Sequence, residues 1–184
     1  TTYQRVDERE LYRFAQQAFE AAGAPPQNAA IIADNLVQGE LHGLGSHGVS
    51  RLLPTYVKRL RAGGINPNPQ ITVVRQHGST AVVDGDHGPG SVVGMFAMRL
   101  AIDLAREHGS GWVAVRNSNH FGAAFLFARE ALPLDMIGYS ATSAVPTVNA
   151  YGGKGKALGT NPLCMAVPGG KRGDIILDMA TSAI

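Results

Sequence analysis

Cysteine is nearly absent from this chain, in which Cys164 is the only one among 184 residues. One cysteine excludes an internal disulfide framework and is typical of a reducing compartment. No run of about eighteen apolar residues occurs, so no membrane-spanning helix is expected. The opening residues TTYQRVDERELYRF carry charges where a signal peptide has an apolar core, and we therefore expect a cytoplasmic protein with no membrane partner.

The sequence also has little net charge and lacks the residue spacings typical of metal sites. The 16 basic and 14 acidic residues leave a formal charge of +2, too little to indicate nucleic acid as a partner. The sequence has no His-x-x-x-His, no Cys-x-x-Cys and no carboxylate pair at ligand spacing, so we predict no metal site. Cys164 lies in the apolar stretch NPLCMAVP and is predicted to be a buried, unreactive strand residue.

Hydrophobic periodicity divides the chain into a helical segment, residues 1–66, and a mixed α/β domain, residues 67–184. The predicted helices of the first part cover about 7–22, 27–40 and 50–62. The second part alternates predicted strands, at 71–76, 80–85, 112–117, 136–142, 161–170 and 174–180, with helices at 90–109 and 122–132. The predicted fold class is therefore α/β. The last strand is apolar enough to be buried between neighbours, and we expect this chain to be the N-terminal part of a longer one, with an incomplete second domain.

Two histidines, two serines and an arginine occur among four glycines in GELHGLGSHGVSR, residues 39–51. His47 and Arg51 share a face if the third helix begins early enough, because residues four apart are neighbours on a helix. Imidazole can pass a proton near neutral pH, and the planar fork of arginine matches a carboxylate. With Ser46 orienting the imidazole or the substrate oxygen, this group suits a small acid with an adjacent ketone or hydroxyl. The alternative is a glycine-rich turn with solvated polar side chains.

A second candidate stretch is VRNSNHFGAA, residues 115–124, between an apolar strand and an apolar helix. It places His120 at the carboxyl end of a strand, where α/β sheets bind ligands. The alternative is a helix N-cap, which accounts for Asn117 to Asn119 but not for His120. The glycine-rich stretches DGDHGPGSVVG and YGGKGKALGTNP match neither the dinucleotide fingerprint nor a P-loop, so no Rossmann nucleotide site is predicted.

Together, the segments SHGVSR, NSNHFGA, GTNP and LDMATSA resemble the second malate/L-lactate dehydrogenase family, in its order and spacing. The resemblance runs from about residue 7 to the end. Relatives in this family include ureidoglycolate dehydrogenase, sulfolactate dehydrogenase, diketogulonate reductase and piperideine-carboxylate reductase. It implies a non-Rossmann fold, a homodimer, and NAD or NADP as cofactor in the reduction of 2-oxo acids or cyclic imino acids. One departure is ALPLDMIG, where the family usually has a glycine before the strand, and it affects only a turn.

The resemblance also implies roles for individual residues. His47 matches the proton-donating histidine, flanked by Ser46 and Arg51, and His120 matches a second histidine called the acid/base in some members. The motif that lines the active-site cleft corresponds to Thr160, Asn161 and Pro162. The cofactor-contacting stretch corresponds to Asp178, Met179 and Ala180, continued by Thr181 and Ser182.

The predicted function is an NAD- or NADP-dependent oxidoreductase that interconverts a 2-hydroxy acid and a 2-oxo acid, with a small carboxylic acid as substrate. Histidine serves as the acid/base and arginine holds the carboxylate. One alternative is a cyclic imino-acid reductase of the same family, and another is a non-catalytic module that binds a small anion. The sequence leaves open whether His47 or His120 is the main acid/base, which acid is the substrate, and which of NAD and NADP is used.

Overall fold

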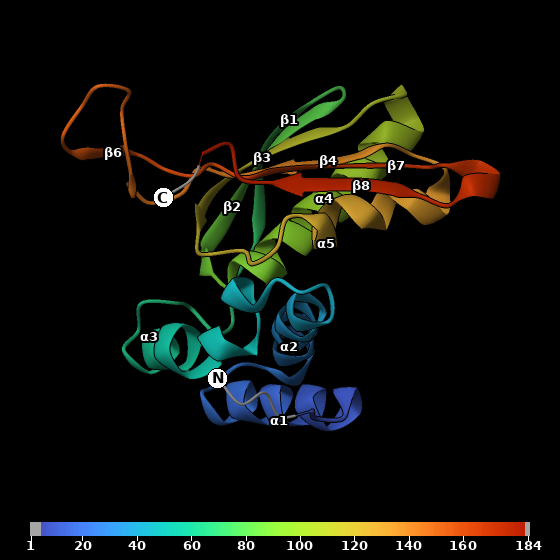
Figure 1. The fold of residues 1–184 in the computed structure, drawn as a ribbon. Helices are drawn as coiled ribbons and strands as arrows, with labels where there is room; N and C mark the ends of the chain where they lie inside the picture. The colour runs from blue at the N-terminus through green and yellow to red at the C-terminus, as the bar shows by residue number, and fades with distance from the viewer. Residues whose placement is uncertain (1–4, 183–184) are drawn as a thin grey trace. The chain divides into compact units, whose positions relative to one another are not determined.

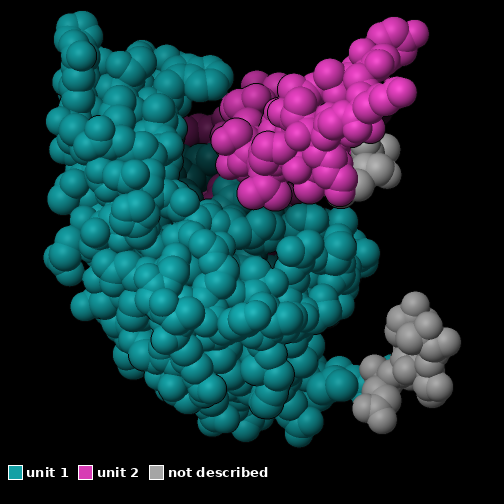
Figure 2. Space-filling model, turned by 90° about the vertical axis from the view of Figure 1, so that its left-hand side faces the viewer, with its two compact units in different colours: residues 1–123 teal, residues 124–184 magenta. Residues whose placement is uncertain are grey.

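The computed structural model describes residues 5–182. Its chain forms two compact units, residues 1–123 and 124–184, which Figure 2 colours separately. The boundary predicted after residue 66 separates helices from strands inside the first unit, whereas the compact units part after residue 123. The expected order of helices followed by a mixed α/β part is observed (Figure 1).

Two regular helices open the first unit, close to their predicted positions. α1 (Glu8–Ala21) starts where the carboxylate of Asp7 accepts hydrogen bonds from the backbone N–H groups of its first turn. This cap satisfies amides that have no partner inside the helix. α2 (Pro26–Leu41) begins with proline, whose missing N–H costs nothing in the first turn.

The third helical stretch is irregular. It consists of a 3₁₀ turn η2 (Val49–Arg51), a π-helix η3 (Leu52–Val57) and one α-turn α3 (Lys58–Arg61). The predicted start near residue 50 is confirmed, but Pro54 lies within the π-helix rather than in the first turn. Proline has no N–H to donate to the regular helical ladder, and a wider turn accommodates that gap.

The side chains buried between these helices form the core of the helical part. Phe19 and Tyr56 contact each other edge to face, with ring centroids 6.1 Å apart. The fully buried members of this core with the largest side chains come from all three helical stretches and the loop after them: Phe19, Ile32, Leu36, Leu52 and Ile65. The helical part thus has its own hydrophobic core, and Tyr56 belongs to it.

A three-stranded sheet follows in the first unit, in the order β1-β2-β3. β1 (Thr72–His77) and β2 (Thr80–Gly88) form the predicted antiparallel hairpin. β2 then pairs in parallel with β3 (Trp112–Ser118), and the crossover between them is α4 (Gly90–His108), which packs on both strands. Parallel neighbours need such a crossover, and their carboxyl ends lie at the same edge of the sheet.

The second unit contains an antiparallel sheet in the order β4-β7-β8. Its strands are β4 (Gly138–Ala141), β7 (Leu163–Val167) and β8 (Ile175–Met179), and a small hairpin of β5 (Val148–Asn149) and β6 (Lys156–Leu158) lies apart from it. The predicted helix of this unit is shorter than expected, with α5 (Phe125–Ala128) continuing as a 3₁₀ turn η4 (Arg129–Leu134). Asp135, in the turn that departs from the family pattern, takes a left-handed φ of 56°.

The last strand is expected to be buried between neighbours in a longer chain, and residues 5–182 cover only one of its edges. β8 pairs with β7 along one edge only, and Ile175 and Leu177 are 66% and 53% exposed. The central strand β7 is covered on one face, where Cys164 is fully buried as predicted. Burial and the nearby Asp178 carboxylate raise the pKa of the Cys164 thiol to about 12, which agrees with an unreactive cysteine. Over residues 5–182, no helix has the length and apolar character to cross a membrane.

Packing of α4 on the first sheet depends on a close approach at Gly111. A Cβ at this position would lie 1.9 Å from the carbonyl oxygen of Ala101, a backbone atom that cannot move independently of the helix. We expect Gly111→Ala to lower the free energy of unfolding by about 2 kcal/mol or more, as overpacking of a core does. Denaturant titration measures the loss.

Gly155→Ala is the matched control, because a Cβ there meets nothing within 4 Å. Equal stability of the two variants would contradict the close packing of α4 against Gly111, which directly precedes β3.

Candidate active site

The segment between α2 and the π-helix folds into two 3₁₀ turns, η1 (Gly45–His47) and η2. Gly48 separates them in an extended conformation, with φ −94° and ψ −159°. A Cβ on Gly48 would lie 2.2 Å from a carboxylate oxygen of Glu40, and one on Gly39 would lie 3.0 Å from the carbonyl oxygen of His47. The glycines of this stretch therefore let the turn lie against the end of α2.

Ser46, His47 and Arg51 meet within this segment, although not on one helix face. The extended backbone at Gly48 interrupts the helix, so the predicted four-residue spacing does not align His47 with Arg51. Instead, Arg51 Nε donates to the carbonyl oxygen of Ser46, and Ser46 Oγ lies 2.9 Å from His47 Nδ1. No acceptor within residues 5–182 takes a hydrogen bond from the two Nη groups of Arg51, which leaves its fork for a ligand.

His120 follows directly after β3, as predicted, and its neighbours hold the loop in place. Asn119 Nδ2 donates to the carbonyl oxygens of His87 and Gly88, at 2.6 and 3.2 Å, and Asn119 Oδ1 accepts from Arg59 at 2.7 Å. A Cβ on Gly90 would lie 2.2 Å from the backbone oxygen of Asn119. The start of α4 therefore packs directly against the backbone that carries His120.

The alternative N-cap role of this loop is wrong. α5 begins only at Phe125, and its N-cap residue Ala124 provides no side-chain hydrogen bond. Asn117 instead adopts a left-handed φ of 52° and donates to Asp84, whose pKa is lowered by hydrogen bonds from Asp86 N–H, Asn117 and Arg116. The aspartates of the DGDHGPG stretch thus brace the bulge at the end of β2.

The structure brings His47 and His120 together across the sequence. Their rings are stacked, with centroids 5.5 Å apart and planes inclined by 21°. The hydroxyl of Tyr56 lies 2.7 Å from His120 Nδ1. Burial, followed by the positive charges of His47, Arg51 and Arg59, lowers the pKa of His120 to about 4.

Tyr56 and Arg59 were not predicted from the sequence. Both come from the irregular third helical stretch, and their partners are about sixty residues away, at separations of 64 and 60. Tyrosine in an apolar helix is ordinarily a core residue, so its pattern contained no functional signal. Tyr56 follows Arg51 by five residues, and this spacing brings the two residues to the same side only in a π-helix.

The other predicted site residues lie in the second unit, where the cleft motif, residues 160–162, is a neighbour of the cofactor stretch, residues 178–182. Thr181 donates to the carbonyl oxygen of Thr160 through its backbone N–H and its hydroxyl, at 2.9 and 3.0 Å. Asn161 has a left-handed φ of 40°, and its side-chain oxygen accepts from Ala144 N. Asp178 accepts from Phe125 N at 2.8 Å at the start of α5, where a carboxylate is favourable. Met179 is 44% exposed.

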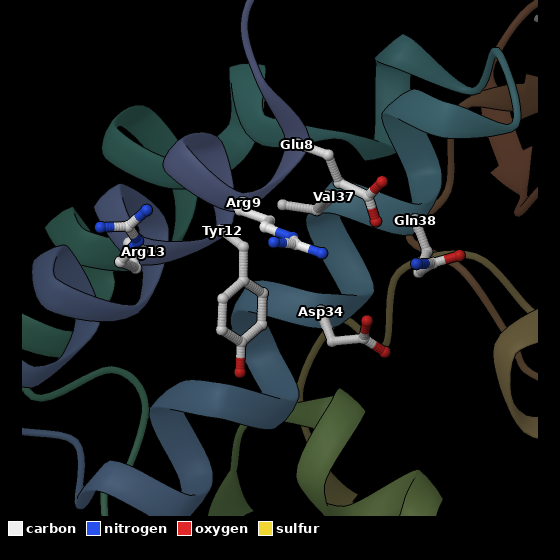
Figure 3. A pocket seen from close by; sticks show the side chains of 7 residues that line it. All are labelled: Glu8, Arg9, Tyr12, Arg13, Asp34, Val37 and Gln38. Carbon is white, nitrogen blue, oxygen red and sulfur yellow. The ribbon is translucent and has the colours of Figure 1, made fainter.

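A cavity of about 270 Å³ lies elsewhere in the first unit, between α1 and α2. Its lining residues carry both signs of charge (Figure 3): Glu8, Arg9, Tyr12, Arg13, Asp34, Val37 and Gln38. None of the predicted site residues is among them. Within the described part of the chain, no group of three or more His, Cys, Asp or Glu residues is arranged to hold a metal ion.

The depressed pKa of His120 makes stability depend on pH. An unfolded histidine binds a proton below about pH 6.5, whereas the folded chain keeps His120 neutral down to about pH 4. Stability is therefore lost as pH falls through this window, and His120→Asn should reduce that loss. Denaturant midpoints at about pH 7 and about pH 5 measure the difference.

His77→Asn, at the exposed last residue of β1, should keep the full pH dependence of the parent protein. Identical pH dependence in the parent protein and in His120→Asn would contradict a neutral, partly buried His120.

The sequence profile of the family described as Malate/L-lactate dehydrogenase matches residues 6–184. A malate dehydrogenase of Pyrococcus abyssi is 46% identical over 182 residues, which are 99% of this chain and 50% of that protein. An L-sulfolactate dehydrogenase of Methanocaldococcus jannaschii is 47% identical over 162 residues, 88% of this chain and 46% of that protein.

The solved structure of malate dehydrogenase from Pyrococcus horikoshii superimposes with a TM-score of 0.95 at 44% identity, over 99% of this chain and 52% of that one. The chain thus spans about half the length of the relatives it matches. These matches confirm the predicted family and its fold. The chain belongs to the malate/L-lactate dehydrogenase family.

Proposed function

We propose that this chain carries the acid/base and carboxylate-binding residues of an oxidoreductase that interconverts 2-hydroxy acids and 2-oxo acids. The observation that carries the proposal is the stack of His47 on His120 beside the Arg51 guanidinium. Similar proteins are named malate and L-sulfolactate dehydrogenases, and both of those acids have a hydroxyl next to a carboxylate. A proton-transferring ring and a carboxylate-binding fork are the two elements that such a substrate requires.

Arg51 is proposed to bind the carboxylate. Its Nε is held by the carbonyl oxygen of Ser46, so the guanidinium plane is oriented before substrate arrives. Two parallel charge-assisted hydrogen bonds from such a fork determine both the position and the orientation of the acid. Preorganisation of this kind lowers the entropic cost of binding.

His47 is proposed to transfer the proton. In reduction, the carbon–oxygen double bond gains a hydride at carbon, the electron pair moves to oxygen, and the protonated His47 gives its N–H proton to that oxygen. In oxidation, neutral His47 accepts the same proton from the hydroxyl. The contact between Ser46 Oγ and His47 Nδ1 holds the ring in one orientation for this transfer.

NAD or NADP is the proposed cofactor and supplies or accepts the hydride when it is bound. The segment Met179–Ser182 is proposed to contact it. An exposed methionine side chain beside hydroxyl-bearing residues fits a flat amide-bearing ring such as nicotinamide, which needs apolar contact and hydrogen-bond partners. The homodimer that the family implies is part of the same proposal.

The full-length polypeptide tests this function directly. It should bind NADH or NADPH with a change in fluorescence, and it should oxidise one of them in the presence of a 2-oxo acid. A panel of 2-oxo acids and cyclic imino acids, each with both cofactors, separates the two substrate classes. Binding of the acid without oxidation of either cofactor would favour a non-catalytic anion-binding module.

His47→Ala in the full-length protein should lower kcat by roughly 10²- to 10⁴-fold, the usual contribution of general acid catalysis. Cofactor affinity should change much less, because the lost group acts on the substrate oxygen. Steady-state kinetics and NADH titration measure the two effects. His77→Ala is the control because it lies outside the cluster, and near-parental turnover of His47→Ala would remove the role proposed for His47.

Arg51→Lys should raise KM for the acid by about 10- to 100-fold, because the lysine ammonium cannot make both parallel charge-assisted hydrogen bonds and one of the two is lost. Arg61→Lys, an exposed arginine of α3, provides the matched control. Substrate saturation curves give KM for both variants. An unchanged KM in Arg51→Lys would mean that another residue binds the carboxylate.

A further inference from the structure

Tyr56 reaches the histidine cluster from inside the hydrophobic core. Its side chain is only 2% exposed and contacts Phe19 edge to face. At its other end, the hydroxyl lies 2.7 Å from His120 Nδ1. One end of the phenol is thus fixed by packing, and the other end contacts one chosen nitrogen of the imidazole ring.

The π-helix explains why Tyr56 points toward this cluster. Lys58 N–H donates to the carbonyl oxygen of Leu53, five residues earlier, instead of four. In a regular α-helix, the residue that shares a face with Arg51 is Thr55, whereas the wider turn brings Tyr56 to that side. Arg51 accordingly lies close enough to affect the pKa of the Tyr56 phenol.

The direction of the hydrogen bond follows from the chemistry of the two groups. Burial raises the pKa of Tyr56, so the phenol keeps its proton. Within residues 5–182, His120 Nδ1 is the only hydrogen-bond partner of this hydroxyl, and a buried O–H donor requires an acceptor. A phenol that donates to Nδ1 requires a lone pair there, which places the proton of neutral His120 on Nε2.

We propose that Tyr56 is a positioning residue that holds His120 as the neutral tautomer with its proton on Nε2. This inference rests on the proposed function, in which His120 then offers an N–H donor to the substrate oxygen while His47 transfers the proton. The two histidines therefore have different roles. No described residue takes a hydrogen bond from His120 Nε2, in agreement with a donor reserved for a ligand.

The charges around His120 also favour a neutral His120 beside a proton-transferring His47. The groups that face His120 are the His47 ring, the guanidinium groups of Arg51 and Arg59, and the Tyr56 phenol. Three of these groups are or become cationic and none is anionic, so a second positive charge on His120 is unfavourable. A neutral N–H donor can stabilise negative charge that develops on the substrate oxygen without itself losing a proton.

Nitrogen-15 NMR of the full-length protein, labelled at histidine, tests the inference without substrate. The His120 signals, identified by their loss in His120→Gln, should show a protonated Nε2 and an unprotonated Nδ1 at neutral pH. In Tyr56→Phe, which keeps the packing on Phe19, the Nδ1-protonated tautomer should appear and kcat should fall about 2- to 10-fold, as for one lost hydrogen bond.

Tyr12→Phe is the matched control, because it removes a phenol hydroxyl from the same helical core and leaves His120 unchanged. A protonated Nδ1 in the parent protein, or an unaltered tautomer in Tyr56→Phe, would overturn the inference. Failure of the proposed function is a separate result: the expected tautomer with no turnover of any acid would leave the Tyr56–His120 assignment intact and remove only its catalytic meaning.

Discussion

The hydrogen bond between Tyr56 and His120 joins two parts of the first unit that are 64 residues apart in sequence. One partner is embedded in the helical core and the other lies at the carboxyl end of β3. The packing that stabilises the helices therefore also orients the imidazole, because the buried phenol cannot move without losing its contact with Phe19. The site residues of this unit are arranged around that link.

Close backbone approach makes the link geometrically feasible. Gly90 allows the start of α4 to contact the backbone of Asn119 and His120, and Gly39 and Gly48 let the His47 turn lie against α2. Asn119, which Arg59 also binds, ties the His120 loop to the bulge at the end of β2. The abundance of glycine near the candidate residues thus reflects packing of backbone on backbone, in addition to flexible turns.

The sequence predicted what local patterns determine. The first two helices, the hairpin, the strand before His120 and the buried Cys164 all follow from hydrophobic periodicity and turn residues, and the structure has them. Ordered motifs identified the family, which no single motif did. The π-helix was not predictable, because a one-residue shift in hydrogen bonding leaves no trace in an apolar pattern.

Contacts between residues far apart in the sequence could not be predicted from local patterns either. The stack of His47 on His120 depends on how the 3₁₀ turns meet the end of β3, and the role of Tyr56 depends on that stack. The covering of β8 is also beyond a local pattern, since an apolar run specifies that a strand tends to be covered but not by which part of a protein. Roles of the second-unit residues 160–162 and 178–182 stay predictions.

A crystal structure of the full-length polypeptide with oxamate, an unreactive analogue of a 2-oxo acid, tests the central claim most directly. The account predicts that the carboxylate of oxamate binds the guanidinium of Arg51 in a bidentate manner. It also predicts that the amide oxygen accepts a hydrogen bond from His120 Nε2 and lies within hydrogen-bond distance of the His47 ring. Oxamate bound at a position that contacts neither Arg51 nor the stacked histidines would contradict the account.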